Sequence, residues 1–143
     1  MRSKTQDIVF LFLRWIVATI FIVAGITKIL NPLTFAEDID NYQILPYLLV
    51  TLMAIILPWL EVLCGFFLII GKLQKGAALT LMIMTFIFLA AIISGIVRGL
   101  DISCGCFTST TEWNSIGYTR LVEEIIFSVL VVLVYIRSLK VPD

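Results

Sequence analysis

The chain has 143 residues, enough for one compact domain and too few for two of ordinary size. It is 61% hydrophobic and 14% charged, with a mean hydropathy of +1.10. Soluble domains are about 45–50% apolar and about 25% charged, so this composition indicates an integral membrane protein. Ten basic and ten acidic residues cancel to a net charge of +0, which leaves no basic surface for nucleic acid.

The chain contains no histidine. Histidine is the commonest metal ligand and the usual general base, so its absence excludes His-ligated haem, histidine-based zinc sites and Ser-His or Cys-His nucleophile pairs. We predict no metal site. Any chemistry must use Cys, carboxylate, Lys, Arg, Tyr or a bound cofactor.

Four apolar stretches follow one another along the chain: residues 8–30, 47–70, 77–97 and 121–139. Each is near the length of about 20 residues that a helix needs to cross a hydrocarbon core about 30 Å thick. The first is too long for a signal peptide core and contains Arg14. The predicted fold is all-α, with residues 1–143 forming a single domain that is an integral membrane four-helix bundle.

Residues 31–46 join the first two stretches and predict a short interfacial helix. Pro32 ends the first span, and Thr34 with Glu37 matches a T-x-x-E capping box. The residues that follow at helical spacing would form its apolar side: Phe35, Ile39 and Tyr42.

The basic residues near span ends predict the orientation, because Lys and Arg accumulate on the cytoplasmic side. Such residues lie before the first span, between the second and third spans, and at the end of the fourth span: Arg2, Lys4, Lys72, Lys75, Arg137 and Lys140. We therefore expect a multi-pass protein of the cytoplasmic (inner) membrane with both termini cytoplasmic. Residues 31–46 and 98–120 then form extracytoplasmic loops.

Two charged residues lie inside predicted spans at similar depths: Arg14 at about 9 Å and Glu61 at about 13 Å from the cytoplasmic ends. An unpaired charge there costs at least about 2.5–3.5 kcal/mol, which favours an Arg14–Glu61 ion pair. Two interpretations stay open: a pair that fixes helix register, or a polar pocket for a quinone-like ligand or proton traffic.

Five residues of the first span follow one another at helical spacing and share one face, which we expect to point into the protein: Arg14, Ala18, Phe21, Gly25 and Lys28. The small residues Ala18 and Gly25, with Gly65 on the second span, predict close helix contact.

Further polar residues gather toward the outer side. Lys28 has Glu123 and Glu124 as candidate partners, and Arg120 can pair with either at i+3 or i+4. One face of the third span also runs outward: Thr80, Met84, Ile87, Ala91, Ser94 and Arg98. We expect these groups to converge on an extracytoplasmic vestibule.

Two of the three cysteines form the segment S-C-G-C-F at residues 103–107, in the second outer loop. Disulfides persist outside the cytoplasm, and Gly105 lets the backbone bend. In an extended chain the Cα atoms of Cys104 and Cys106 lie about 7 Å apart, near the limit for a disulfide, so a bridge between them would be strained and labile. This favours a redox pair over a passive disulfide or capture of Cu(I), which stay as alternatives.

Two arginines, Arg98 and Arg120, bracket this loop in sequence and would favour thiolate, whereas Asp101 opposes them. The third cysteine, Cys64, lies inside the second span, and we expect it to be a small apolar core residue.

These motifs, in their order, resemble the MauE branch of the DoxX-like membrane proteins. The resemblance covers nearly the whole chain and is carried by residues 24–32 (AGITKILNP), 42–46 (YQILP), 57–61 (LPWLE) with Gly65, 104–107 (CGCF), and Arg120. One departure is Thr108, where the family usually has glycine.

The resemblance implies a four-helix membrane protein with Cys104 and Cys106 as the redox pair and Lys28, Glu61 and Arg120 as matching polar positions. MauE is associated with maturation of the disulfide-rich methylamine dehydrogenase small subunit alongside a thioredoxin-like partner. DoxX-type relatives are linked to quinone-coupled sulfur oxidation. The resemblance does not imply that this chain acts in methylamine metabolism.

We therefore predict a membrane thiol–disulfide redox protein that acts through Cys104 and Cys106 and serves the maturation of secreted proteins. Its expected partners are the lipid bilayer, an extracytoplasmic thioredoxin-like protein or a cysteine-containing client, with quinone as the candidate cofactor. The residues expected to surround that cofactor are Lys28, Glu61, Arg14, Arg98, Arg120 and Glu124. The alternatives are a non-catalytic assembly or chaperone partner and a carrier of a small molecule or soft metal.

Overall fold

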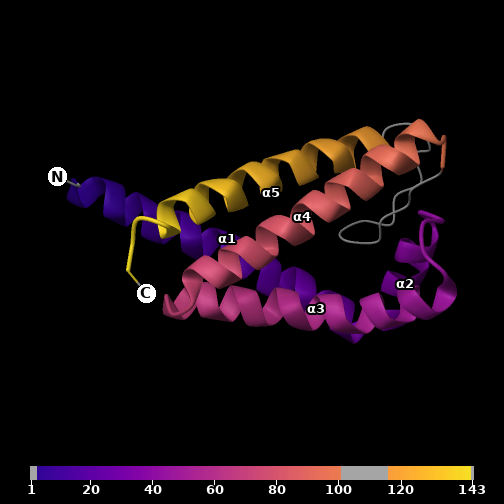
Figure 1. Ribbon diagram of the computed structural model, residues 1–143, viewed down its shortest axis with the longest axis horizontal. Helices are drawn as coiled ribbons and strands as arrows, with labels where there is room; N and C mark the ends of the chain where they lie inside the picture. Colours follow the sequence, from indigo (N-terminus) through magenta and orange to yellow (C-terminus); the bar gives the residue numbers. More distant parts are fainter. Residues whose placement is uncertain (1–2, 101–115, 143) are drawn as a thin grey trace.

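The computed structural model describes residues 3–100 and 116–142, which form helices joined by short turns (Figure 1). In chain order these helices are α1 (Lys4–Leu30), α2 (Pro32–Asp40), α3 (Tyr47–Ile70), α4 (Gln74–Val97) and α5 (Ile116–Ser138). Within the described ranges no residue lies in a β-strand. The all-α prediction is therefore confirmed for this part of the chain.

Three of the described helices, α1, α3 and α4, are long and apolar enough to cross a membrane. They contain the first three predicted spans, with α1 and α4 each beginning a few residues earlier than expected. The fourth predicted span, residues 121–139, coincides with α5 up to Ser138, and α5 is not among the three. The charged residues of α5 shorten its apolar stretch: Arg120, Glu123, Glu124 and Arg137. The structure thus describes a helical membrane protein.

The boundary between α1 and α2 is made by Asn31, which is both the C-cap of α1 and the N-cap of α2. Its backbone N–H donates to the Thr27 carbonyl at 3.2 Å. Pro32 occupies the first turn of α2, where a missing N–H costs nothing. The predicted capping box of Thr34 and Glu37 is wrong, because α2 begins at Pro32 and has no side-chain cap.

The predicted apolar residues are buried, although Tyr42 lies beyond the end of α2 at Asp40. Phe35, Ile39 and Tyr42 are all buried, with exposed fractions of 4%, 9% and 6%. Phe35 and Ile39 pack with Val50 and Ala54 of α3. This contact holds α2 against the first turns of α3.

The turn between α3 and α4 spans residues 71–73 and depends on left-handed backbone conformations. Gly71 has φ +81°, which glycine adopts freely, and Leu73 has φ +52°. From this turn α3 and α4 diverge, and α5 runs beside α4 (Figure 1).

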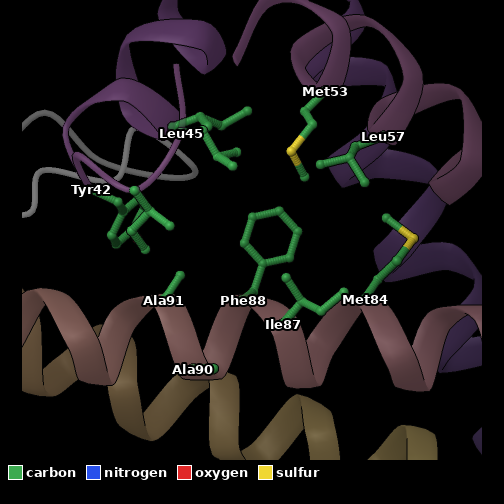
Figure 2. Close-up of a pocket in the computed structure, with 11 residues that line it drawn as sticks. Tyr42, Leu45, Met53, Leu57, Met84, Ile87, Phe88, Ala90 and Ala91 are labelled. Atoms are coloured by element: carbon green, nitrogen blue, oxygen red, sulfur yellow. The ribbon is translucent and has the colours of Figure 1, made fainter. Parts of the chain in front are cut away.

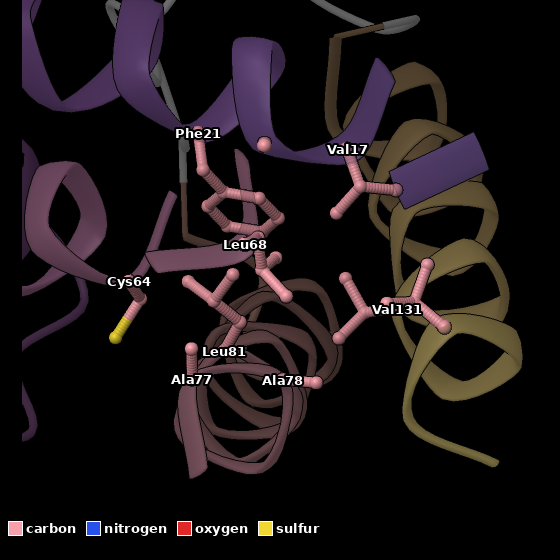
Figure 3. Packing of buried hydrophobic residues seen from close by; sticks show 10 residues of the cluster. Val17, Phe21, Cys64, Leu68, Ala77, Ala78, Leu81 and Val131 are labelled. Carbon is pink, nitrogen blue, oxygen red and sulfur yellow. The ribbon is translucent and has the colours of Figure 1, made fainter. Parts of the chain in front are cut away.

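The main core lies between the helices near the 71–73 turn (Figure 3). Side chains of α1, α3, α4 and α5 meet there, and those of Leu68 and Leu81 have no exposed area. Because the core draws the helices together at this end, the divergence of α3 and α4 leaves space at the other end.

Candidate functional site: a buried ion pair beside an apolar cavity

Two glycines bring α1 and α3 into backbone contact. A Cβ atom on Gly25 would lie 2.8 Å from the Pro58 carbonyl oxygen, and one on Gly65 would lie 2.9 Å from the Ala18 carbonyl oxygen. Neither site has room for a side chain. The prediction that small residues permit close approach of these two helices is confirmed.

Next to this contact, Lys28 of α1 forms an ion pair with Glu61 of α3. The Lys28 Nζ lies 2.8 Å from Oε1 and 3.1 Å from Oε2 of Glu61. The two side chains are 12% and 4% exposed. A carboxylate and an ammonium can remain charged at such a site because each partner replaces the other's lost water.

Two aromatic rings also lie close to the ammonium group. Its Nζ lies 4.8 Å from the ring centroid of Phe35 on α2 and 5.3 Å from that of Phe88 on α4. Both distances permit a cation–π interaction. One ammonium therefore contacts side chains from three other helices, α2, α3 and α4. Sequence reasoning missed both phenylalanines, because aromatic residues in an apolar span carry no signal of a nearby cation.

The predicted Arg14–Glu61 pair is wrong. Arg14 donates from Nη1 to Oε1 of Gln74 at 3.0 Å, and its guanidinium lies against Gly71. Since α1 and α3 are antiparallel with Gly25 opposite Val62, Arg14 lies opposite the end of α3, ten residues or about 15 Å from Glu61. Helical side chains also lean toward their own N-terminus, which carries Arg14 away from Glu61 and Lys28 toward it.

The remaining predicted polar residues lie near the end of α4 and the start of α5. Arg120 pairs with Glu123 at 3.1 Å, one of its two expected partners. Glu124 is half-buried on α5, one residue further along. Arg98, the C-cap of α4, donates from Nη2 to the backbone carbonyl of Tyr42.

Between α2, α3 and α4 lies a cavity of about 400 Å³ (Figure 2). Its wall is apolar, and the side chains shown in Figure 2 include Leu45, Met53, Leu57, Met84 and Phe88. The predicted outward face of α4 does reach this space through Met84, Ile87 and Ala91.

The wall of this cavity is apolar, whereas the predicted vestibule was to be polar, and the structure leaves that vestibule untested. Polar groups lie at the edge of the cavity, where Phe88 contacts the Lys28 ammonium and Tyr42 contacts Arg98. Thr80, at the other end of that α4 face, donates its hydroxyl to the Gly76 carbonyl of the same helix at 2.9 Å.

The predicted redox pair, Cys104 and Cys106, lies outside the described residues. Cys64 is free, 7% exposed and part of the main core, as expected (Figure 3). Within residues 3–100 and 116–142, no three His, Cys, Asp or Glu side chains come together in a way that could hold a metal ion.

Helices that can cross a membrane, closely packed through glycines and joined by an internal ion pair, define a polytopic helical membrane protein. Comparison with known families gives its place in that class: residues 6–137 match the model of the methylamine utilisation protein MauE. The chain belongs to the MauE family, which confirms the resemblance seen in its motifs.

Two curated relatives carry the name methylamine utilization protein MauE. The protein of Methylophilus methylotrophus is 34% identical over 119 residues, covering 82% of this chain and 63% of the relative. That of Paracoccus denitrificans is 30% identical over 103 residues, covering 71% and 55%. The chain thus spans less than two thirds of the length of either relative. No solved structure matches it.

Proposed function

We propose that this protein is a membrane thiol–disulfide redox protein in which Cys104 and Cys106 exchange electrons with an extracytoplasmic thioredoxin-like protein or a cysteine-containing client. The observation that carries the proposal is the C-G-C sequence at residues 104–106 in a chain whose remaining cysteine, Cys64, is buried in the core. The names of the two relatives connect those proteins with methylamine utilization. The proposal requires only a client that contains cysteines.

A cation near the start of the cysteine loop supports the proposal. Four residues of chain reach at most about 14 Å, so the backbone of Cys104 stays within that distance of Leu100. Leu100 packs with Tyr42 and Ile92, next to the Arg98 guanidinium. A cation near a thiol favours the thiolate, which is the attacking form in disulfide exchange.

The exchange consists of two displacements at sulfur. A thiolate of Cys104 or Cys106 attacks the partner's disulfide, forms a mixed disulfide and releases one partner thiolate. The second cysteine then attacks the mixed disulfide, forms the Cys104–Cys106 disulfide and releases the second partner thiolate. Two electrons pass to the partner, and the reverse sequence oxidises a client. A quinone would accept the two electrons and two protons from the dithiol and become a quinol.

The topology proposed for this function has α5 as a fourth span, α2 at the membrane surface and the cysteine loop outside the cytoplasm. At 1.5 Å per residue, the 23 residues of α5 extend about 35 Å, which exceeds the hydrocarbon thickness of about 30 Å. The basic residues near the 71–73 turn, Lys72 and Lys75, favour a cytoplasmic location for that end.

Thiol counting tests the proposal in a Cys64→Ser background, which removes the buried cysteine. Purified protein is reduced, exposed to oxidised thioredoxin or to a soluble quinone, and then labelled with a maleimide that adds mass. We expect two labelled thiols after reduction and none after oxidation. The Cys104→Ser or the Cys106→Ser variant should trap a covalent adduct with thioredoxin. Unchanged labelling together with no adduct would contradict the proposal and favour a non-catalytic assembly partner.

A further inference from the structure

The cavity between α2, α3 and α4 has physical properties that restrict what fills it. Its volume of about 400 Å³ falls in the range of small-molecule sites. Water is stable in a cavity only with two to four polar partners, and this wall is apolar. An unfilled space of this size would forfeit the dispersion contacts of every side chain around it. The occupant is therefore apolar.

The cavity is also accessible from the lipid-facing surface. Two of its lining residues, Ile44 and Ile87, are 52% and 56% exposed. Ile83 and Phe86, which lie near Ile87 on α4, are exposed as well. A hydrocarbon chain of the bilayer can enter here without crossing a polar surface.

A cation lies at the right distance for the head of such a molecule. Arg98 ends α4, seven residues or about 10 Å beyond Ala91 and fourteen residues or about 21 Å beyond Met84. Half of a hydrocarbon core is about 15 Å thick. A phosphate at Arg98 would thus place its acyl chain alongside the α4 wall of the cavity.

Arg98 also has binding capacity left. Its Nη2 donates to the Tyr42 carbonyl, which uses one of five guanidinium N–H groups. Arg98 is exposed, and among the described residues it forms no ion pair with a carboxylate. Tyr42 itself lines the cavity, so the cation stands at the rim.

We propose that the cavity binds one acyl chain of a membrane phospholipid whose phosphate is held by Arg98. The charge at the rim complements the phosphate, and the apolar wall complements the chain. Arg98 is shared with the surroundings of the cysteine loop proposed above, but lipid retention and thiol exchange are measured separately, so either proposal can fail without the other.

The test measures lipid that stays with the protein after extensive detergent exchange. The protein is reconstituted in vesicles of phosphatidylethanolamine and phosphatidylglycerol, repurified, and extracted for mass spectrometry. We expect about one phospholipid per chain. Ala91→Trp, which fills the cavity from α4, should reduce the retained lipid at least fivefold, and Arg98→Gln should reduce it at least twofold.

The matched control is Ile93→Trp, which introduces the same side chain on the exposed face of α4 outside the cavity and should retain the lipid. If Ala91→Trp does not fold, as judged by gel filtration and circular dichroism, Met53→Trp fills the cavity from α3 and decides the question. Equal retention in the cavity variant and the control, no retained lipid in the unmodified protein, or a retained molecule without phosphate would overturn the proposal.

Discussion

Lys28 contacts side chains of three other helices in the interior of this membrane protein. It binds both carboxylate oxygens of Glu61 and lies near the rings of Phe35 and Phe88. In a medium that cannot solvate charge, an ion pair of this kind costs little as long as both partners are present. Removing one partner leaves the other charge buried and unpaired.

We expect Glu61→Leu to destabilise the protein by about 3 kcal/mol, because Lys28 then loses its counter-charge in the interior. Glu123→Leu is the matched control. Glu123 pairs with Arg120 but its side chain is 46% exposed, so its loss should cost at most about 1 kcal/mol. Unfolding of both variants in detergent micelles measures the difference. Equal losses of stability would show that the buried Lys28–Glu61 pair contributes no more than the exposed Arg120–Glu123 pair.

Because Glu61 pairs with Lys28 and not with Arg14, double-mutant cycles should give a coupling energy for the first pair of residues and none for the second. Lys28→Leu combined with Glu61→Leu should lose less stability than the sum of the single losses, with a coupling of about 1–3 kcal/mol. Arg14→Leu combined with Glu61→Leu should be additive within about 0.5 kcal/mol, since Arg14 binds Gln74 and lies against Gly71, about 15 Å along α3 from Glu61. A large coupling of Arg14 with Glu61 would contradict the structure.

At the scale of the helices, the contact between α1 and α3 depends on glycines that face the partner backbone. A Cβ on Gly25 would lie 2.6 Å from Cγ2 of Val62, and one on Gly65 would lie 2.6 Å from Cγ1 of Ile22. Both distances are shorter than any real contact, so an added methyl group must push the helices apart. The ion pair beside Gly25 would then lengthen too.

We expect Gly25→Ala and Gly65→Ala each to destabilise the protein by about 1–3 kcal/mol through this overpacking. Gly76→Ala, on α4, provides the control because no atom lies within 4 Å of its added Cβ. It should be neutral or stabilise α4 by up to about 1 kcal/mol, since alanine is the better helix former. The same micelle unfolding assay compares the three variants, and destabilisation by Gly76→Ala alone would refute the argument.

At the scale of the whole molecule, the helices meet near the 71–73 turn and separate toward the other end, where α2, the cavity and Arg98 lie. The two ends therefore differ in how tightly their side chains pack. One end contains the packed core, and the other contains the apolar cavity and the exposed Arg98.

The proposed orientation is tested with single cysteines introduced into a variant in which all three native cysteines are replaced by serine. Lys72→Cys, in the turn, should react with a membrane-impermeant maleimide only after the cells are permeabilised. Gln43→Cys, in the connection between α2 and α3, should react in intact cells. The reverse pattern would turn the molecule over and place Cys104 and Cys106 in the reducing cytoplasm, which would end the redox proposal.

By itself, the sequence determined the helical membrane class, the inward face of α1 and the small residues at the α1–α3 contact. These features follow from composition and from helical periodicity, which are local properties of a chain. The burial of Glu61 and Lys28 was also predictable, because each lies on a face or in a span that must turn inward.

Only the tertiary structure decided which charges meet. Depth counted along each span placed Arg14 and Glu61 together, but the stagger of α1 on α3 and the lean of each side chain paired Glu61 with Lys28 instead. The apolar cavity likewise arises because α3 and α4 diverge from a shared turn, an angle that no single segment encodes. Periodicity fixes which side of a helix faces inward, whereas contacts between helices fix what it faces.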